Sequence, residues 1–316
     1  MKIITEQYCL KSEKVKKNII IALIADLHYI GTTEYSTNID IMKAVLNMKP
    51  NYICICGDFF GGFGTNNFEN KKVMNILLDL LEKLKKIAPV ILSLGNHDLT
   101  IRKDKELRKL FKQLKSENIY PLDNESVEFE DCLFSGFYAS RKSYAISKIS
   151  KRKSKMIVKD WNKSDFKPSK NKYNILCHHL PDTLYNKTIK DNISNLFDYD
   201  IVLSGHTHNG SLSEKYIEKR NQKIDNKILK AKSDKIRVQL EKKKYYGFCE
   251  SIINFPPFLR KVSRGMHYVN GTNLIISKGI TSGIKFIIKD KIVFDISKNF
   301  PSYITQIKIE PVVKMD

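Results

Sequence analysis

Five short polar clusters, each directly after an apolar run, contain most of the residues in this sequence that could do metal chemistry. Six of the seven histidines of the chain lie in these clusters, whereas chance would spread them out. Carboxylate oxygen together with imidazole nitrogen, without thiolate, suits Mn, Fe, Zn or Co. The clusters are Asp26-Leu27-His28, Gly57-Asp58, Gly95-Asn96-His97-Asp98, His178-His179 and Gly205-His206-Thr207-His208.

The supply of ligands in these clusters exceeds one tetrahedral site. Two Asp, one Asn and about four His can fill two sites of about five or six ligands each, once water or substrate joins them. Two divalent ions about 3.5–4 Å apart need a carboxylate between them, and they activate a water for in-line attack on phosphorus. The glycines before Asp58, Asn96 and His206 allow the backbone to turn tightly there.

The apolar runs before the clusters are short enough to be buried strands. In open α/β sheets, ligands gather beyond the carboxyl ends of such strands, where the clusters stand. Alternation of strands with helical patterns in the first 135 residues predicts parallel pairing in βαβ units. The strands are expected at 18–25, 52–56, 90–94, 173–177 and 201–204.

Three helices are expected between the first strands. The first begins at a cap of Ser36 or Thr37 and ends before Pro50. Its apolar residues Ile39, Met42 and Leu46 fall on one face. The other two helices cover 69–87 and about 103–116. Later in the chain, hairpins are expected for 127–129 with 132–135, for 266–269 with 274–277, and for 283–288 with 292–296.

The order of the clusters resembles the signature of the calcineurin-like metallophosphoesterase superfamily: D-x-H, G-D, G-N-H-D/E, a lone His and G-H-x-H. The run ILCHHLPD at 175–182, the segment 205–210 and the tail at 264–271 and 274–279 resemble a bacterial subgroup, which includes the YkuE- and YaeI-type phosphoesterases. One departure is that Asn209, Gly210 and Ser211 follow His208, where that subgroup usually has G-G-Q. Relatives also often carry an N-terminal membrane helix or signal.

This resemblance implies a fold and a set of roles. The fold is an α/β four-layer α/β/β/α sandwich of two mixed β-sheets flanked by helices, in a single domain over 1–316 with the metals at one edge. His97 would stand beside the scissile phosphate, as general acid or as a stabiliser of transition-state charge. Asp98 would orient His97 by accepting a hydrogen bond. The implied metal ligands are Asp26, His28 and His208 for the first ion, Asn96, His179 and His206 for the second, and Asp58 as the bridge.

The formal charge of +21 is concentrated in two stretches. Residues at about 141–172 carry a net charge of +10 and residues at about 213–250 carry +6, and both are predicted to be basic surface insertions. The excess fits an anionic membrane surface, nucleic acid, or simply the composition of an AT-rich genome. No apolar run of about 18 residues exists, so a cytoplasmic protein is expected, with peripheral membrane association as an option. No obligate protein partner is evident.

The expected function is hydrolysis of a phosphate ester by a dinuclear metal centre with a bridging hydroxide. The two divalent ions would be Mn, Fe, Zn or Co, with Mg as a further candidate. The alternatives are a lipid or nucleotide-diphosphate hydrolase at the membrane surface, a nuclease that tracks nucleic acid through the basic stretches, and a non-catalytic scaffold. The scaffold is least favoured because every ligand of the signature is present. The sequence leaves open whether the substrate is a monoester or a diester.

Overall fold

A computed structural model describes most of the chain in separate segments. The described residues are 2–61, 70–100, 104–140, 151–208, 226, 229–230, 233, 264–280, 285–288, 291–295 and 301–312. Nearly all of the second basic stretch, 213–250, therefore lies outside the described residues.

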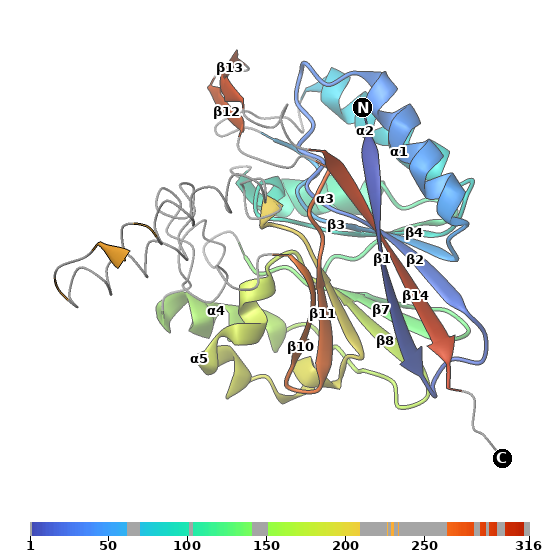
Figure 1. Ribbon diagram of the computed structural model, residues 1–316, viewed down its shortest axis with the longest axis vertical. Coiled ribbons are helices and arrows are strands. Elements are labelled where there is room, and N and C mark those ends of the chain that lie inside the picture. Colours follow the sequence, from blue (N-terminus) through green and yellow to red (C-terminus); the bar gives the residue numbers. More distant parts are fainter. Residues whose placement is uncertain are drawn as a thin grey trace.

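Two mixed sheets of six strands each form the centre of the molecule (Figure 1). In both sheets four neighbouring strands run parallel, and antiparallel strands join them at the sides. The first sheet has the order β1 (Ile3–Ser12), β14 (Ser302–Pro311), β2 (Ile19–Ile24), β3 (Tyr52–Cys56), β4 (Val90–Ser93), β5 (Ile119–Pro121). The second has the order β10 (Gly265–Val269), β11 (Thr272–Ile276), β9 (Ile201–Ser204), β8 (Tyr173–Cys177), β7 (Cys132–Gly136), β6 (Ser126–Glu128).

Helices cover the outer faces of both sheets. In Figure 1, α1 (Tyr35–Met48) and α2 (Lys71–Leu84) lie beside the first sheet, and α4 (Lys151–Trp161) and α5 (Lys187–Lys190) lie on the other side. Helix α3 (Asp104–Gln113) follows β4, and short 3-10 turns span Asp98–Thr100, Pro181–Tyr185 and Ser194–Asp198. The expected α/β class and the four-layer sandwich are confirmed. Among the described residues, no helix combines the length and apolarity needed to span a bilayer.

The central strands are apolar on both sides because each side faces a core. Leu23, Cys54 and Ile91 of the first sheet belong to the same buried cluster as Ile175 and Leu203 of the second. The alternate residues of these strands join a second cluster with the helices. This two-sided burial explains why the strands are continuous apolar runs in the sequence. Because the strands are buried on both sides, their ends are the first positions that polar side chains can occupy.

Helix α1 departs from its predicted cap and orientation. It begins at Tyr35 and its N-cap, Glu34, makes no side-chain cap hydrogen bond, so the predicted Ser36 or Thr37 cap is wrong. Its buried residues are Asn38, Ile41, Val45 and Met48. The predicted apolar face is the outer one, since Ile39 and Leu46 are 41% and 53% exposed. The helix has two apolar stripes, and periodicity alone does not select the stripe that faces the sheet.

Helix α4 lies within the first basic stretch, whose residues 151–172 are described. Its residues Ile157 and Trp161 are buried in the core, and the Trp161 ring centroid lies 4.8 Å from that of Phe137, just after β7. This part of the stretch therefore supplies an outer-layer helix with an apolar inner face. The three expected hairpins are present as β6–β7, β10–β11 and β12 (Lys285–Ile288) with β13 (Lys291–Asp295).

Candidate metal centre

The five polar clusters meet at one edge of the sandwich. The parallel strands β2, β3 and β4 of the first sheet and β8 and β9 of the second end there. Contacts across the sheets join the clusters: the backbone N–H of His206, after β9, lies 3.1 Å from both carboxylate oxygens of Asp26, after β2. The parallel arrangement thus gathers side chains that are up to 182 positions apart in the chain, Asp26 to His208.

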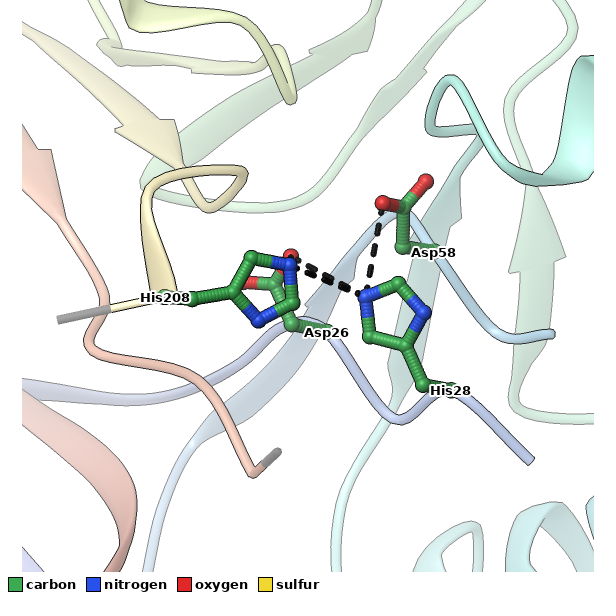
Figure 2. Close-up of side chains that lie close together, drawn as sticks. All are labelled: Asp26, His28, Asp58 and His208. Atoms are coloured by element: carbon green, nitrogen blue, oxygen red, sulfur yellow. Dashed lines mark hydrogen bonds and ion pairs between the residues drawn. The ribbon is translucent and has the colours of Figure 1, made fainter. Parts of the chain in front are cut away.

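Four of the predicted ligands form a first group (Figure 2). Asp26, His28, Asp58 and His208 each offer one ligand atom, and these atoms all lie within 4.8 Å of one another. The Nε2 atoms of His28 and His208 are 3.1 Å apart. The Nε2 atom of His28 lies 3.6 Å from Asp58 Oδ2, and that of His208 lies 3.6 Å from Asp26 Oδ1. Two carboxylates and two imidazoles therefore converge on one small volume.

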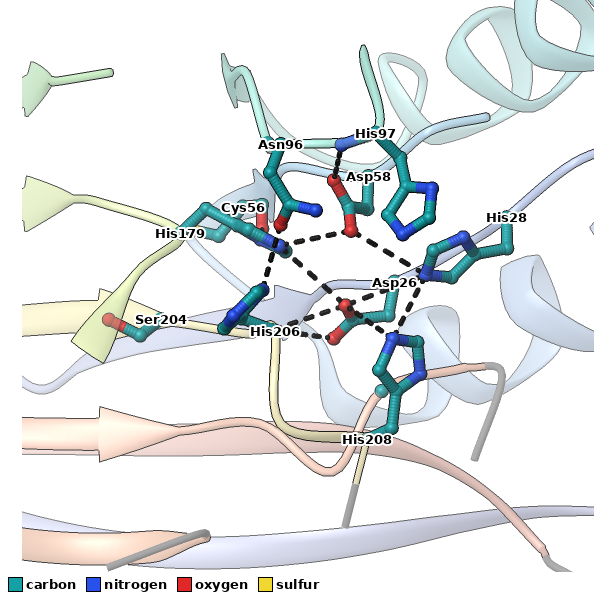
Figure 3. Close-up of polar contacts among 12 residues, drawn as sticks. Asp26, His28, Cys56, Asp58, Asn96, His97, His179, Ser204, His206 and His208 are labelled. Carbon is teal, nitrogen blue, oxygen red and sulfur yellow. Dashed lines mark hydrogen bonds and ion pairs between the residues drawn. The ribbon is translucent and has the colours of Figure 1, made fainter. Parts of the chain in front are cut away.

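A second group shares Asp58 with the first (Figure 3). Its members are Asp58, His179 and His206, and the Nε2 atom of His179 lies 3.1 Å from Asp58 Oδ2. Asn96 adjoins this group because its Oδ1 atom is 2.7 Å from Nδ1 of His206. The backbone carbonyl of Cys56 lies 2.8 Å from Nδ1 of His179, which leaves Nε2 of that ring facing the cluster. The structure thus brings together all seven residues that the resemblance implied as ligands.

The charges of the cluster perturb its titration. Burial acts to raise the pKa of Asp58, but the imidazoles of His179 and His97 outweigh burial and hold this pKa well below its usual range. Burial acts to lower the pKa of His179, but Asp58 and Asp26 raise it to about 9. Burial, reinforced by His179, lowers the pKa of His206 to about 3. A cation that binds this cluster would take the place of the proton on His179.

Two buried atoms of the cluster have unused hydrogen-bonding capacity. Asp58 Oδ2 and His179 Nε2 are inaccessible to solvent, and although these two atoms lie 3.1 Å apart, neither makes a hydrogen bond of good geometry. Buried polar atoms are normally satisfied, so such atoms at a functional edge point to a missing partner. Oxygen and nitrogen donors in two groups around a shared carboxylate fit a pair of divalent cations. The residues present therefore fit the dinuclear group that the sequence implied.

The backbone around the cluster is held in a sparsely populated conformation. Non-glycine residues adopt the left-handed region rarely, at a cost of about 1–3 kcal/mol each, and such strain concentrates at functional sites. Five of the seven predicted ligands have a positive φ between 48° and 75°: Asp26, His28, Asp58, His206 and His208. Their side chains face the cluster because each strand turns sharply at its end.

His97 stands beside the cluster without belonging to either group. Its backbone N–H donates a 2.8 Å hydrogen bond to Asp58 Oδ1, and its ring meets that of His28 edge-on with centroids 4.8 Å apart. Burial lowers the pKa of His97 to about 4, and the nearby imidazoles of His28 and His208 add to this effect. Its ring is therefore neutral near pH 7 in the absence of a bound anion.

The carboxylate of Asp98 accepts hydrogen bonds from the backbone of two strand ends. Its Oδ2 atom accepts the backbone N–H groups of Asp58 (2.9 Å) and Gly95 (2.8 Å), and its Oδ1 atom accepts that of Phe60 at 3.3 Å. The expected role of Asp98 in orienting the His97 side chain stays a prediction. Burial, with the charge of Asp58, raises the pKa of Asp98 to about 7. Asp98 ties the turn that carries Asp58 to the turn after β4.

Changing Asp98 to Asn should weaken metal binding by about 10–100-fold, the usual cost of altering a group that orients ligands. The amide has one oxygen in place of two, and its NH₂ group would face a backbone N–H. A competition titration with a coloured chelator measures this affinity. As the control, Asp131→Asn changes another buried aspartate, at the β6–β7 turn, and should bind metal as the unchanged protein does. Equal affinities for both variants would contradict this role.

Gly95 permits the turn after β4 to approach Asp58. A Cβ atom at this position would overlap the Oδ1 and backbone N atoms of Asp58. Gly95→Ala should therefore displace the carboxylate shared by the two groups and lower metal affinity and hydrolysis together, by at least about 10-fold. Gly31→Ala is the matched control, because its Cβ would meet only Asn70 Nδ2 at an ordinary 3.6 Å. Unchanged metal binding in Gly95→Ala would show that this close approach is unimportant.

The two remaining histidines lie outside the groups. His178 is buried, with Nδ1 3.0 Å from the carbonyl oxygen of Phe137 and Nε2 against Thr183 Oγ1, so both ring nitrogens have partners. The Nε2 atom of His267 lies 2.7 Å from the carbonyl oxygen of Arg264. Gly279, which was not among the predicted site residues, also adjoins the centre, since a Cβ atom there would lie 2.9 Å from Asp26 Cβ. The sequence feature that could have identified Gly279 is its position soon after β11, because the polar clusters also follow strands.

Comparisons with known proteins agree with this geometry at the level of the family. The calcineurin-like phosphoesterase family matches residues 19–210, which is more than half of the chain and includes all five clusters. No curated protein matches the sequence. Among solved structures, a dimetal phosphatase from Danio rerio is 13% identical with a TM-score of 0.36, covering 61% of this chain and 83% of that chain. The chain belongs to the calcineurin-like phosphoesterase family, and is thus a hydrolase that cleaves phosphoesters at a centre suited to two divalent metals.

Proposed function

We propose that this enzyme hydrolyses a phosphate ester with the ions held in two adjoining sites. In this proposal Asp26, His28 and His208 bind one ion and Asn96, His179 and His206 bind the other, while Asp58 bridges them. The observation that carries the proposal is that Asp58, buried and with an unsatisfied oxygen, belongs to both groups of donor atoms.

The donor set restricts the identity of the ions. Imidazole nitrogen predominates, carboxylate and amide oxygens complete the set, and no thiolate takes part. This combination supports Mn, Fe, Zn or Co, whereas Mg, which prefers oxygen and retained water, is a weaker candidate. Elemental analysis of the purified protein would identify which of these ions it binds.

When bound, two divalent ions polarise the phosphoryl oxygens and make a water molecule between them a nucleophile near neutral pH. The protein side chains do the positioning. Asp58 keeps the two groups at a fixed separation, and Asp98 fixes Asp58 through the backbone N–H bonds of its turn. His97, neutral near pH 7, is placed to donate a hydrogen bond to the charge that develops on the phosphoryl group. Its low pKa favours this role over transfer of a full proton to the leaving oxygen.

Finer assignments depend on motif resemblance. The run from Ile175 to Asp182 and the tail at 264–279 support membership of the bacterial YkuE- and YaeI-type subgroup. A lipid or nucleotide-diphosphate substrate at a membrane surface remains the alternative that this subgroup suggests. A non-catalytic scaffold is disfavoured because the seven donors and His97 are all present at one edge.

A substrate panel tests the proposal. The purified protein would be stripped with a chelator, reloaded separately with Mn, Fe, Zn, Co or Mg, and assayed on aryl phosphate monoesters and diesters, nucleotide-diphosphate conjugates and phospholipids. We expect hydrolysis of at least one phosphoester that disappears with the chelator and returns with a metal. Inactivity with every ion and substrate, or activity that ignores the chelator, would contradict the proposal.

A further inference from the structure

One side of helix α4 carries a row of basic side chains. Arg152, Lys155 and Lys159 are three and four positions apart and therefore lie on the same face of the helix, and Lys163 follows in the next turn. All four are exposed. None of their charged groups forms an ion pair with any residue that the structure describes. The row is thus a strip of positive charge that forms no ion pair with the described part of the protein.

The opposite side of α4 fixes this row in place. Ser154, Ile157 and Trp161 are at most 3% exposed and pack into the molecule. The indole Nε1 atom of Trp161 donates a 2.9 Å hydrogen bond to Asn195 Oδ1, which anchors the helix to a neighbouring segment. The cations therefore project from a rigid, core-packed element, and their spacing is set by the helix.

Side-chain contacts connect the buried face of helix α4 to the segments that follow β7 and β8. The ring of Trp161 lies 4.8 Å from that of Phe137, which in turn lies 5.1 Å from the ring of His178. His178 directly precedes the predicted ligand His179. The carboxylate of Asp160 accepts the backbone N–H of Ser140 at 2.9 Å, which ties the same end of the helix to the segment after β7.

We propose that the α4 row, defined as Arg152, Lys155, Lys159 and Lys163, binds the phosphate backbone of a polynucleotide. Like charges three or four positions apart destabilise a helix by about 0.2–0.5 kcal/mol per pair, and a bound polyanion relieves this repulsion. From Arg152 to Lys159 the row extends about 10 Å, at about 1.5 Å per residue. Each strand of a duplex carries one phosphate per about 3.4 Å of the duplex axis, so a duplex aligned with α4 would present about three phosphates of one strand over this length.

The surface fits a polynucleotide better than a membrane. A helix that binds a bilayer inserts an apolar face, and stable anchoring takes an apolar contribution in addition to charge. The apolar face of α4 is buried in the protein core and cannot insert. The large apolar side chains exposed on the described helices and sheets belong to other elements, such as Leu46 of α1 and Tyr268 of β10. Backbone binding to nucleic acid needs only cations, which α4 supplies.

This inference deepens the proposed function and rests on it in one respect. A polynucleotide held by α4 would supply phosphodiester groups as substrate for the proposed hydrolysis. Binding and hydrolysis can nevertheless be measured separately. The α4 row includes none of the predicted ligands, so changes to the row leave the hydrolysis of a small aryl phosphate diester unaffected.

The test is charge reversal on the row. Fluorescence anisotropy would measure binding of a labelled single-stranded oligonucleotide to the full chain, in chelator to prevent cleavage, over a series of salt concentrations. Each phosphate contact contributes about 0.7 to the slope of log K against log salt for a single strand. The double variant Lys155→Glu/Lys159→Glu should bind more weakly, with a slope shallower by about 1.4. The same preparations would be tested by co-sedimentation with vesicles of anionic phospholipid.

A matched variant separates a local surface from overall charge. Lys43→Glu/Lys86→Glu makes the same change in net charge at two exposed lysines beside the first sheet, on α1 and after α2. It should bind the oligonucleotide almost as the unchanged protein does. The inference is overturned if both double variants lose binding equally, or if the unchanged protein does not bind the oligonucleotide. It is also overturned if the protein binds the vesicles and not the oligonucleotide. If the unchanged protein binds the oligonucleotide but does not hydrolyse the aryl diester, the proposed function fails and this inference stands.

Discussion

Replacing Asp58 with alanine should abolish metal-dependent hydrolysis of an aryl phosphate diester. Asp58 is the one side chain that belongs to both groups of donor atoms, and it is completely buried. Altering a residue that merely orients a ligand costs about 10–100-fold, so removing the shared ligand should cost more than about 100-fold. Steady-state assays at saturating metal, together with metal analysis of the dialysed protein, measure both effects.

Two further variants make the Asp58 result interpretable. Asp58→Asn preserves the volume of the side chain and removes its charge, so it should lose activity while keeping the thermal unfolding midpoint of the metal-free protein. Asp165→Ala removes a carboxylate that is 83% exposed and that, among the described residues, pairs only with Lys167, so it should have no effect. Full activity in Asp58→Ala would eliminate the bridging assignment.

The second large effect should come from His97. His97→Ala should keep both ions and slow turnover by about 10²–10³-fold, the range expected when one hydrogen-bond donor to the transition state is removed. The reason is that His97 adjoins the cluster, at 4.8 Å from the His28 ring, without being a member of either donor group. Metal content by elemental analysis and turnover number by steady-state kinetics would be compared with those of the unchanged protein.

The leaving group of the substrate distinguishes the two roles of His97. Loss of a hydrogen-bond donor to the phosphoryl oxygens slows good and poor leaving groups alike, whereas loss of a general acid slows poor leaving groups more. Because burial lowers the pKa of His97 to about 4, we expect equal losses. His267→Ala serves as the control, since His267 contacts the Arg264 carbonyl, and it should turn over normally. Loss of metal from His97→Ala would show that His97 is a ligand.

The parts of the fold that the sequence predicts are those with a strong local pattern. Strands β3, β8 and β9 are short apolar runs that end at a polar cluster, and Asn270–Gly271 marks the turn between β10 and β11. Both turn residues have a positive φ, 50° and 91°, as a two-residue hairpin requires. The convergence of the clusters also follows from sequence, because parallel strands place their carboxyl ends at one edge.

The remainder depends on partners that are distant in the chain. Strand β1 went unpredicted because it pairs with β14, where Ile3 meets Ser302, and local patterning gives no sign of such a partner. The buried side of α1 includes Asn38, whose amide donates to Ile76 O and Asp79, so a polar residue occupies a core position. The acceptor role of Asp98 depends on backbone N–H groups from two strand ends, and residue types alone do not specify that geometry.

In the proposed function, seven side chains form one centre for two ions that share Asp58. A titration of the metal-free protein with Mn, Fe, Zn or Co, followed by elemental analysis and by hydrolysis of an aryl phosphate diester, tests it most directly. We expect that activity rises until two ions are bound per chain, and that Asp58→Ala neither retains two ions nor turns over. Full activity at one ion per chain, or two ions retained without Asp58, would contradict it.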